Sequence, residues 1–209
     1  MKKIIGIFLF LINLTNFTYG QEKEQFIRRA FNNYKSAILT GKGEEAIKFV
    51  DSRTTKYYVN ILGIVKTADS LKITSLPLID KMTVLFTRHT ATKEEILSMN
   101  GNDLFIYSVK KGMVGESSID NIEIGDVVVD GNFAIGQLVS NGQKTSIHFL
   151  FYKEDGQWKF DLTSMFSITN MAIKKMIQDS GENENDFWLS VLEMLTGSKP
   201  KKEIWQPIL

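Results

Sequence analysis

In the stretch 122–162, His148, Tyr152 and Asp161 are the candidates for side chains that move protons. A buried carboxyl group with a raised pKa, or a neutral imidazole, serves as a general acid or base. The dipeptide Arg88-His89, which follows an apolar helical pattern, adds a guanidinium group and a second imidazole. These five residues are the candidates for an enzyme site, and Arg88 and His89 are also candidates for ligand binding.

Each of these candidates also has an ordinary structural explanation. If the stretch folds as strands, His148, Tyr152 and Asp161 lie on the face opposite the aromatic residues. His148 is then a partly exposed residue on an outer or interface face, and Asp161 pairs with a neighbouring cation, a contact that contributes little stability at a surface. Basic residues such as Arg88 and His89 at the end of a helix interact favourably with its C-terminus.

Several kinds of chemistry are excluded by composition. The chain contains no Cys, which removes disulfides, thiol catalysis and thiolate metal sites. Its two histidines have no carboxylate cluster beside them, so no metal site is expected. We find no Ser/His/Asp spacing, phosphate-binding loop or dinucleotide fingerprint, and we predict no cofactor.

Residues 1–20 have the organisation of a secretory signal peptide. Lys2 and Lys3 precede an apolar run at 4–12, and Gly20 offers a small residue for cleavage. The alternative, a membrane anchor, requires a longer apolar run. We expect export to the periplasm or the exterior, with no membrane span after the signal is removed. The 25 basic residues include two in this segment, which leaves 23 against 24 acidic residues and gives no reason to expect a nucleic-acid partner.

The stretch 122–162 is predicted to be a meander of antiparallel strands. Asp130-Gly131, Asn141-Gly142 and Asp155-Gly156 supply the positive backbone angles that two-residue hairpin turns require. Between them lie runs rich in β-branched and aromatic residues. Counting outward from each turn predicts four cross-strand pairs: Gly136 with Ile147, Ala134 with Phe149, Phe151 with Phe160, and Phe149 with Leu162.

Alternation of side chains divides this meander into two faces. The face expected to meet the core carries Val127, Ala134, Leu138, Ile147, Phe149, Phe151, Trp158, Phe160 and Leu162. The other face carries Val128, Phe133, Ile135, Gln137, Ser146, His148, Leu150, Tyr152, Lys159 and Asp161. This second face is more apolar than a solvated face should be, and it suggests a homodimer through the sheet.

Helical patterns precede and follow the meander. We expect helices at 22–39, 44–50, 54–68, 75–88, 92–99, 168–178 and 186–195. The run at 104–109 fits a strand or a helix, and we favour a helix because of the residues that flank it. Thr92 and Glu95 have the spacing of a capping box, and Asn100-Gly101 is interpreted as the end of that helix. In the tail, Trp205 either docks back onto the domain or is presented to a partner.

Helices followed by a curved antiparallel sheet that ends in Gly156-Gln157-Trp158 resemble the nuclear transport factor 2-like superfamily, an α+β cone. The other matching features are the helical stripe at 26–38 and the turn into a strand at 130–134. The resemblance covers 21–162 and implies that the N-terminal helix plugs the concave side of the sheet. The helices at 163–209 are an extension that a minimal cone lacks. We expect one α+β domain over 21–209, after the signal peptide at 1–20.

The resemblance leaves three functions open. The first is an exported, non-enzymatic domain that binds a small apolar ligand or a protein partner, with Arg88, His89, Tyr58 and Trp205 as candidate binding residues. The second is a small isomerase, dehydratase or hydrolase with its site inside the cone, since some members of the superfamily use Asp, His, Tyr or Arg there. The third is a structural or envelope-associated protein.

Overall fold

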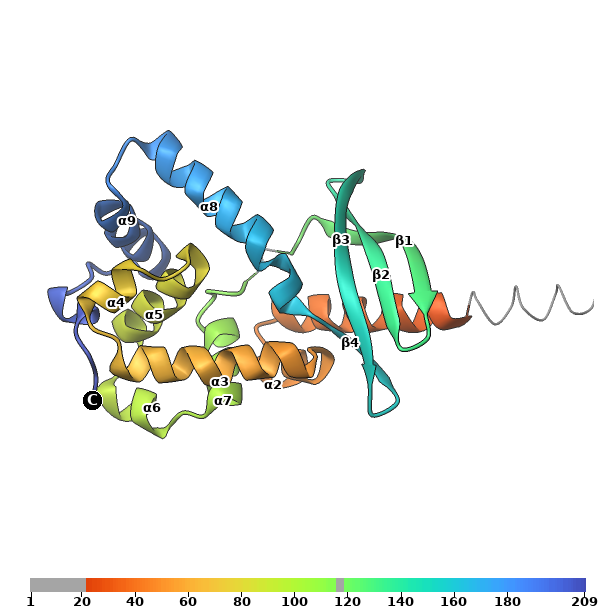
Figure 1. Ribbon diagram of the computed structural model, residues 1–209, viewed down its shortest axis with the longest axis horizontal. Helices are drawn as coiled ribbons and strands as arrows, with labels where there is room; N and C mark the ends of the chain where they lie inside the picture. Colours follow the sequence, from red (N-terminus) through yellow and green to blue (C-terminus); the bar gives the residue numbers. More distant parts are fainter. Residues whose placement is uncertain (1–21, 116–118) are drawn as a thin grey trace, which may run out of the picture.

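The computed structural model describes residues 22–115 and 119–209, so the predicted signal peptide lies outside the described residues. Helices precede and follow a single four-stranded antiparallel sheet (Figure 1). The predicted α+β class is therefore confirmed.

The sheet is the predicted meander, with strands in the order β1-β2-β3-β4. The strands are β1 Ile122–Asp130, β2 Phe133–Ser140, β3 Gln143–Glu154 and β4 Gln157–Phe160. The second and third connections are the predicted dipeptides Asn141-Gly142 and Asp155-Gly156, whereas the first is Gly131-Asn132, one residue later than the predicted Asp130-Gly131, because Asp130 still pairs with Phe133. The three glycines have a positive φ of 56° (Gly131), 72° (Gly142) and 78° (Gly156). Asn141 and Asp155 also adopt a φ of 50°, as a tight hairpin turn requires.

The register between β2 and β3 differs from the prediction by two residues. Ala134 pairs with Phe151, and Gly136 pairs with Phe149, whereas Phe151 pairs with Phe160 as expected. Two extra residues of β3 are accommodated near Thr145, whose hydroxyl donates to the carbonyl of Leu138 at 2.8 Å in place of a regular ladder bond. A shift of two residues leaves every side chain on its predicted face. The predicted pair of Phe149 with Leu162 does not form because β4 ends at Phe160.

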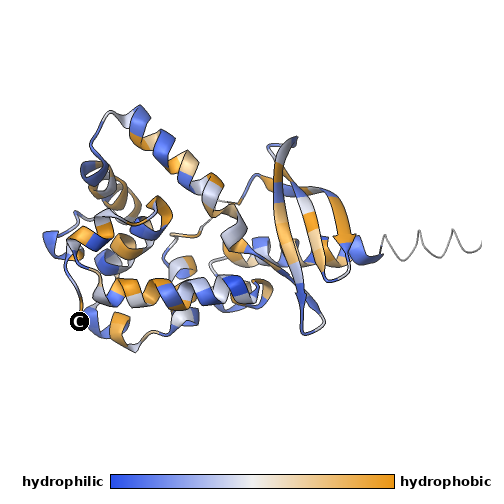
Figure 2. Ribbon diagram, in the orientation of Figure 1, coloured by the Kyte–Doolittle hydropathy of each residue, from blue (hydrophilic) through white to orange (hydrophobic). Residues whose placement is uncertain are grey.

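The two faces of the sheet have different surroundings. All nine residues predicted for the core face belong to the hydrophobic core or pack against it. Val128, Phe133, Ile135, Leu150 and Tyr152 lie outside that core. Figure 2 shows the resulting runs of hydrophobic residues along the strands. We call the surface formed by these five residues the outer face.

Helical residues 22–39 lie across the inner face of the sheet (Figure 1). The ring of Phe31 lies 5.0 Å from that of Phe149, and the ring of Tyr34 lies 5.3 Å from that of Phe160, centroid to centroid. Both side chains are almost completely buried. Aromatic packing therefore fills the concave side of the sheet with the chain's own residues.

The remaining helices form a group beside the sheet (Figure 1). Before the sheet come α2 Gly43–Ala46, α3 Ser52–Thr67, α4 Ser70–Thr74, α5 Leu78–Thr90, α6 Lys93–Ser98 and α7 Gly101–Lys110. Helix α4 was not predicted. Helix α5 begins three residues later than expected because Pro77 is its N-cap.

Asn100-Gly101 begins α7, so the interpretation of this dipeptide as the end of the preceding helix is wrong. The side chain of Asn100 accepts hydrogen bonds from the backbone of Asn102 and Asp103, and Asp103 completes a capping box. The capping box predicted at Thr92 and Glu95 is confirmed. Gly101 also lets α7 approach α3, because a Cβ atom there would lie 2.7 Å from the backbone nitrogen of Val59.

The chain after the sheet returns to this helical group. It comprises a 3₁₀ helix, η3 (Leu162–Met165), then α8 Phe166–Ser180, α9 Glu184–Thr196 and a second 3₁₀ helix, η4 (Lys202–Trp205). Helices α8 and α9 and η4 all contact α5. Ile204 is buried, and Trp205 packs partly against the core, so the tail docks back onto the domain. One hydrophobic cluster thus includes residues from before, within and after the sheet.

Candidate functional site

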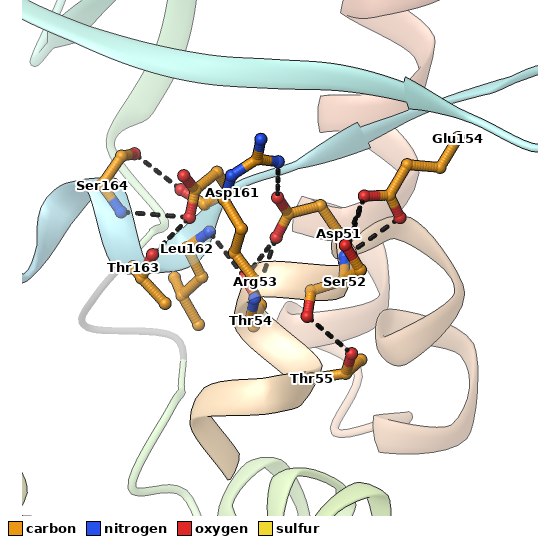
Figure 3. Close-up of polar contacts among 10 residues, drawn as sticks. All are labelled: Asp51, Ser52, Arg53, Thr54, Thr55, Glu154, Asp161, Leu162, Thr163 and Ser164. Carbon is orange, nitrogen blue, oxygen red and sulfur yellow. Dashed lines mark hydrogen bonds and ion pairs between the residues drawn. The ribbon is translucent and has the colours of Figure 1, made fainter. Parts of the chain in front are cut away.

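Two buried carboxylates mark the junction between the sheet and the helices (Figure 3). Asp51 precedes α3 and accepts a hydrogen bond from the backbone of Thr54 at 2.9 Å. Asp161 precedes η3 and accepts from the hydroxyl of Thr163 at 2.6 Å and the backbone of Ser164 at 3.3 Å. Asp51 is 0 % exposed and Asp161 5 % exposed. Each is therefore the N-cap of its own helix.

Thr54 and Arg53 connect this junction. The hydroxyl of Thr54 donates to Asp51 Oδ1 at 2.9 Å and accepts from the backbone nitrogen of Leu162 at 3.0 Å. Arg53 Nη1 donates to Asp51 Oδ2 at 2.9 Å, and this hydrogen bond is the main reason that the pKa of Arg53 is raised. The cluster thus joins the beginning of α3 to the end of β4.

Asp161 was expected on the outer face, next to solvent, and that placement is wrong. The chain leaves the sheet after Phe160, and the carboxylate turns inward to cap η3. Because the carboxylates of Asp51 and Asp161 are both engaged as caps, the arrangement has the chemistry of a structural joint.

The outer face is apolar in its middle and has the guanidinium group of Arg53 at its border. The ring centroids of Phe133 and Tyr152 lie 5.2 Å apart, and the guanidinium carbon of Arg53 lies 3.5 Å from the Tyr152 centroid. A cation stacked on an aromatic face in this way is electrostatically attracted to it. Val128 is 61 % exposed, and His148 is exposed on the same side of the sheet.

Arg88 and His89 bind the chain's own C-terminal segment. Arg88 is 6 % exposed and donates to the carbonyls of Val65 (2.8 Å), Ala68 (2.8 Å) and Ile204 (3.2 Å). Burial lowers the pKa of Arg88 to about 10. Nε2 of His89 lies 2.9 Å from the Thr196 hydroxyl. These residues attach the tail to α3 and α5.

The seven candidate residues do not converge on one site but lie in four places, of which the outer face and the junction are linked by Arg53. His148 and Tyr152 are on the outer face, Asp161 is at the junction, and Tyr58 is buried with its ring 5.1 Å from that of Phe105. Arg88 and His89 contact the C-terminal segment, to which Trp205 itself belongs. The sequence interpretation missed Asp51, although an Asp three residues before Thr54 has the spacing of a helix N-cap.

A shallow groove of about 620 Å³ runs between helical residues 22–39 and β1. Arg28 and Lys35 line it, together with Leu39, Ile122 and Ile124. Both cations already donate hydrogen bonds to backbone carbonyls of residues 120–125. The two cations that line the groove are therefore already engaged in hydrogen bonds within the chain.

Within residues 22–115 and 119–209, no group of three or more His, Asp or Glu residues is placed to hold a metal ion. The same residues include no helix whose length and apolar character would suit a membrane crossing. Comparisons with protein-family models, curated proteins and solved structures gave no match.

Proposed function

We propose that this protein is an exported, non-enzymatic binding domain that takes a protein partner on the outer face of its sheet, and that it self-associates through this face. The observation that carries the proposal is the position of Val128, Phe133, Ile135, Leu150 and Tyr152. They form an apolar sheet surface outside the hydrophobic core. A contiguous apolar surface with a polar border is typical of a protein interaction site.

The two edges of the sheet are poor alternatives for docking. Arg28 and Lys35 donate hydrogen bonds to the outward-facing backbone carbonyls of β1. Strand β4 has four residues, and the backbone nitrogen of Asp51 donates to the carbonyl of Phe160 at 3.0 Å. A protein partner is therefore favoured to approach the face of the sheet rather than its edges.

A protein partner is also favoured over a small apolar ligand inside the cone. Phe31 and Tyr34 already pack against Phe149 and Phe160 on the concave side. The outer face, in contrast, combines Tyr152 with the stacked Arg53, and Tyr and Arg are enriched among residues that dominate binding energy at interfaces.

The test is sedimentation velocity of the purified protein across the micromolar range. We expect a dimer, and we expect Val128→Lys to convert it into a monomer with an unchanged free energy of unfolding. The control is Met171→Lys on α8, because Met171 is also an apolar side chain and is 62 % exposed against 61 % for Val128. A wild-type protein that stays monomeric at high micromolar concentration would contradict self-association through this face.

A further inference from the structure

Strand β1 is one of the two edge strands of the sheet, and in an edge strand about half of the backbone carbonyls point away from the neighbouring strand. The backbone nitrogen of Asn141 donates to the carbonyl of Asn121 at 2.9 Å, so this carbonyl points toward β2. Because carbonyl directions alternate along a strand, those of Asp120, Ile122 and Ile124 point outward. An edge of this kind is a template on which another strand can pair.

Two cations from the N-terminal helical residues occupy this edge. Lys35 Nζ donates to the carbonyls of Asp120 at 2.5 Å and Ile122 at 2.9 Å. Arg28 Nη1 donates to the carbonyl of Ile124 at 2.8 Å, and Nη2 donates to that of Gly125 at 2.6 Å. Residues 28 and 35 are seven apart, which is close to two helical turns and places both side chains on one face.

A β-bulge in β1 creates the pair of carbonyls that Arg28 binds. The register with β2 shifts between Ile124 and Val127, so the carbonyls of Ile124 and Gly125 both face the guanidinium group. The planar fork of an arginine matches two adjacent acceptors, which the single ammonium group of lysine does not. Position 125 suits glycine, because a Cβ atom there would lie 3.0 Å from the side chain of Val139.

We propose that Arg28 and Lys35 form an edge lock, which prevents β1 from pairing with β1 of a second copy of this chain. Two identical β1 edges can pair antiparallel about a twofold axis. The groove beside the edge is open and has a volume of about 620 Å³, so space for an approaching strand exists along the same residues. The carbonyl acceptors that such a strand needs are satisfied by the lock.

The test removes the lock without removing the helix. In a Val128→Lys background, which separates this question from association through the outer face, Arg28→Met with Lys35→Met should shift the protein from monomer to dimer or larger species in sedimentation velocity. Hydrogen exchange in residues 120–130 should become slower as the protein concentration rises. The matched control, Arg29→Met with Lys42→Met, removes the same two charges and should remain monomeric.

Two results would overturn the edge lock. The first is a double variant with a native circular dichroism spectrum that stays monomeric at millimolar concentration. The second concerns Arg28→Lys, which is used if the double variant does not fold. This substitution keeps the positive charge but loses the two parallel donors of the guanidinium group. In the Val128→Lys background it should associate at a lower concentration than Val128→Lys alone. If it associates no more than its parent, the lock is refuted.

Discussion

The hydroxyl of Thr54 donates a hydrogen bond to the carboxylate of Asp51, three residues earlier, at 2.9 Å, and both side chains are 0 % exposed. The same hydroxyl accepts from the backbone of Leu162, 108 residues later in the sequence. One oxygen atom thus links the first turn of α3 to the segment that leaves the sheet.

Replacing this hydroxyl should destabilise the whole domain. Thr54→Val keeps the shape of the side chain but leaves the backbone nitrogen of Leu162 without a partner and removes one of the two hydrogen bonds that Asp51 Oδ1 accepts. We expect a loss of about 1–3 kcal/mol in the free energy of unfolding, measured by urea denaturation. The control is Thr55→Val, whose hydroxyl makes an exposed bond to Ser52 and should cost less than about 0.5 kcal/mol. Equal effects of the two substitutions would refute the role of Thr54.

Replacing two glycines of α3 and α7 with alanine should change the free energy of unfolding in opposite directions. Gly101→Ala should destabilise by about 1–3 kcal/mol, because the added carbon would meet the backbone of Val59 at 2.7 Å. Gly63→Ala lies within α3 and meets nothing within 4 Å, so it should stabilise by about 0.5–1 kcal/mol. Thermal and urea unfolding of the two variants measure both signs. A neutral Gly101→Ala would show that the helices are not in close contact there.

Removing the buried cation of Arg88 should release the C-terminal segment. Arg88→Met leaves carbonyls of α3 and of Ile204 without donors, at an expected cost of about 2–4 kcal/mol. The segment 198–209 should then be cut by protease at lower concentration than in the wild type, as followed by mass spectrometry. Arg29→Met, on the exposed side of the N-terminal helical residues, is the control. A variant whose tail remains resistant would contradict this attachment.

Stability should fall at alkaline pH because of three phenols that are largely buried. Burial raises the pKa of Tyr34, Tyr57 and Tyr58 above the ordinary value of about 10. Above that pH the unfolded chain releases phenolic protons that the folded protein retains, so the free energy of unfolding decreases as pH rises. Arg88 acts in the opposite direction, because its pKa is lowered to about 10 and the folded protein releases this proton first.

Three phenols against one guanidinium leave a net of two protons, and thus a decrease of about 2–3 kcal/mol per pH unit above pH ~11. Urea unfolding at pH 10, 11 and 11.5 measures this slope, and Tyr34→Phe should make it shallower while preserving the contact with Phe160. A free energy of unfolding that stays constant over this range would refute the prediction.

The sheet was predictable because its signals are local. Each turn is specified by a glycine dipeptide, and alternation alone assigned Phe149, Phe151 and Phe160 to the core face. The irregularities of β1 and β3 were not predictable in this way. They depend on contacts such as that of Arg28 with Gly125, which lie 97 residues apart in the sequence.

The candidate site was less predictable because its side chains act at long range. Arg88 was recognised as a cation at the end of a helix, but its bond to Ile204 spans 116 residues. The alternating pattern of β4 predicted that the side chain of Asp161 faces solvent. Strand β4 ends one residue earlier, at Phe160, and the carboxylate of Asp161 is buried as the N-cap of η3. The resemblance to the nuclear transport factor 2-like superfamily stays a prediction.

The attachment of Ile204 to Arg88 has a consequence for the order of events during synthesis. Helices α3 and α5 are translated long before residue 204, yet the guanidinium between them meets its remaining acceptor only when that residue arrives. The hydrogen bonding of the helical half is therefore completed only after residue 204 has been synthesised, and until then the guanidinium group of Arg88 lacks one of its acceptors.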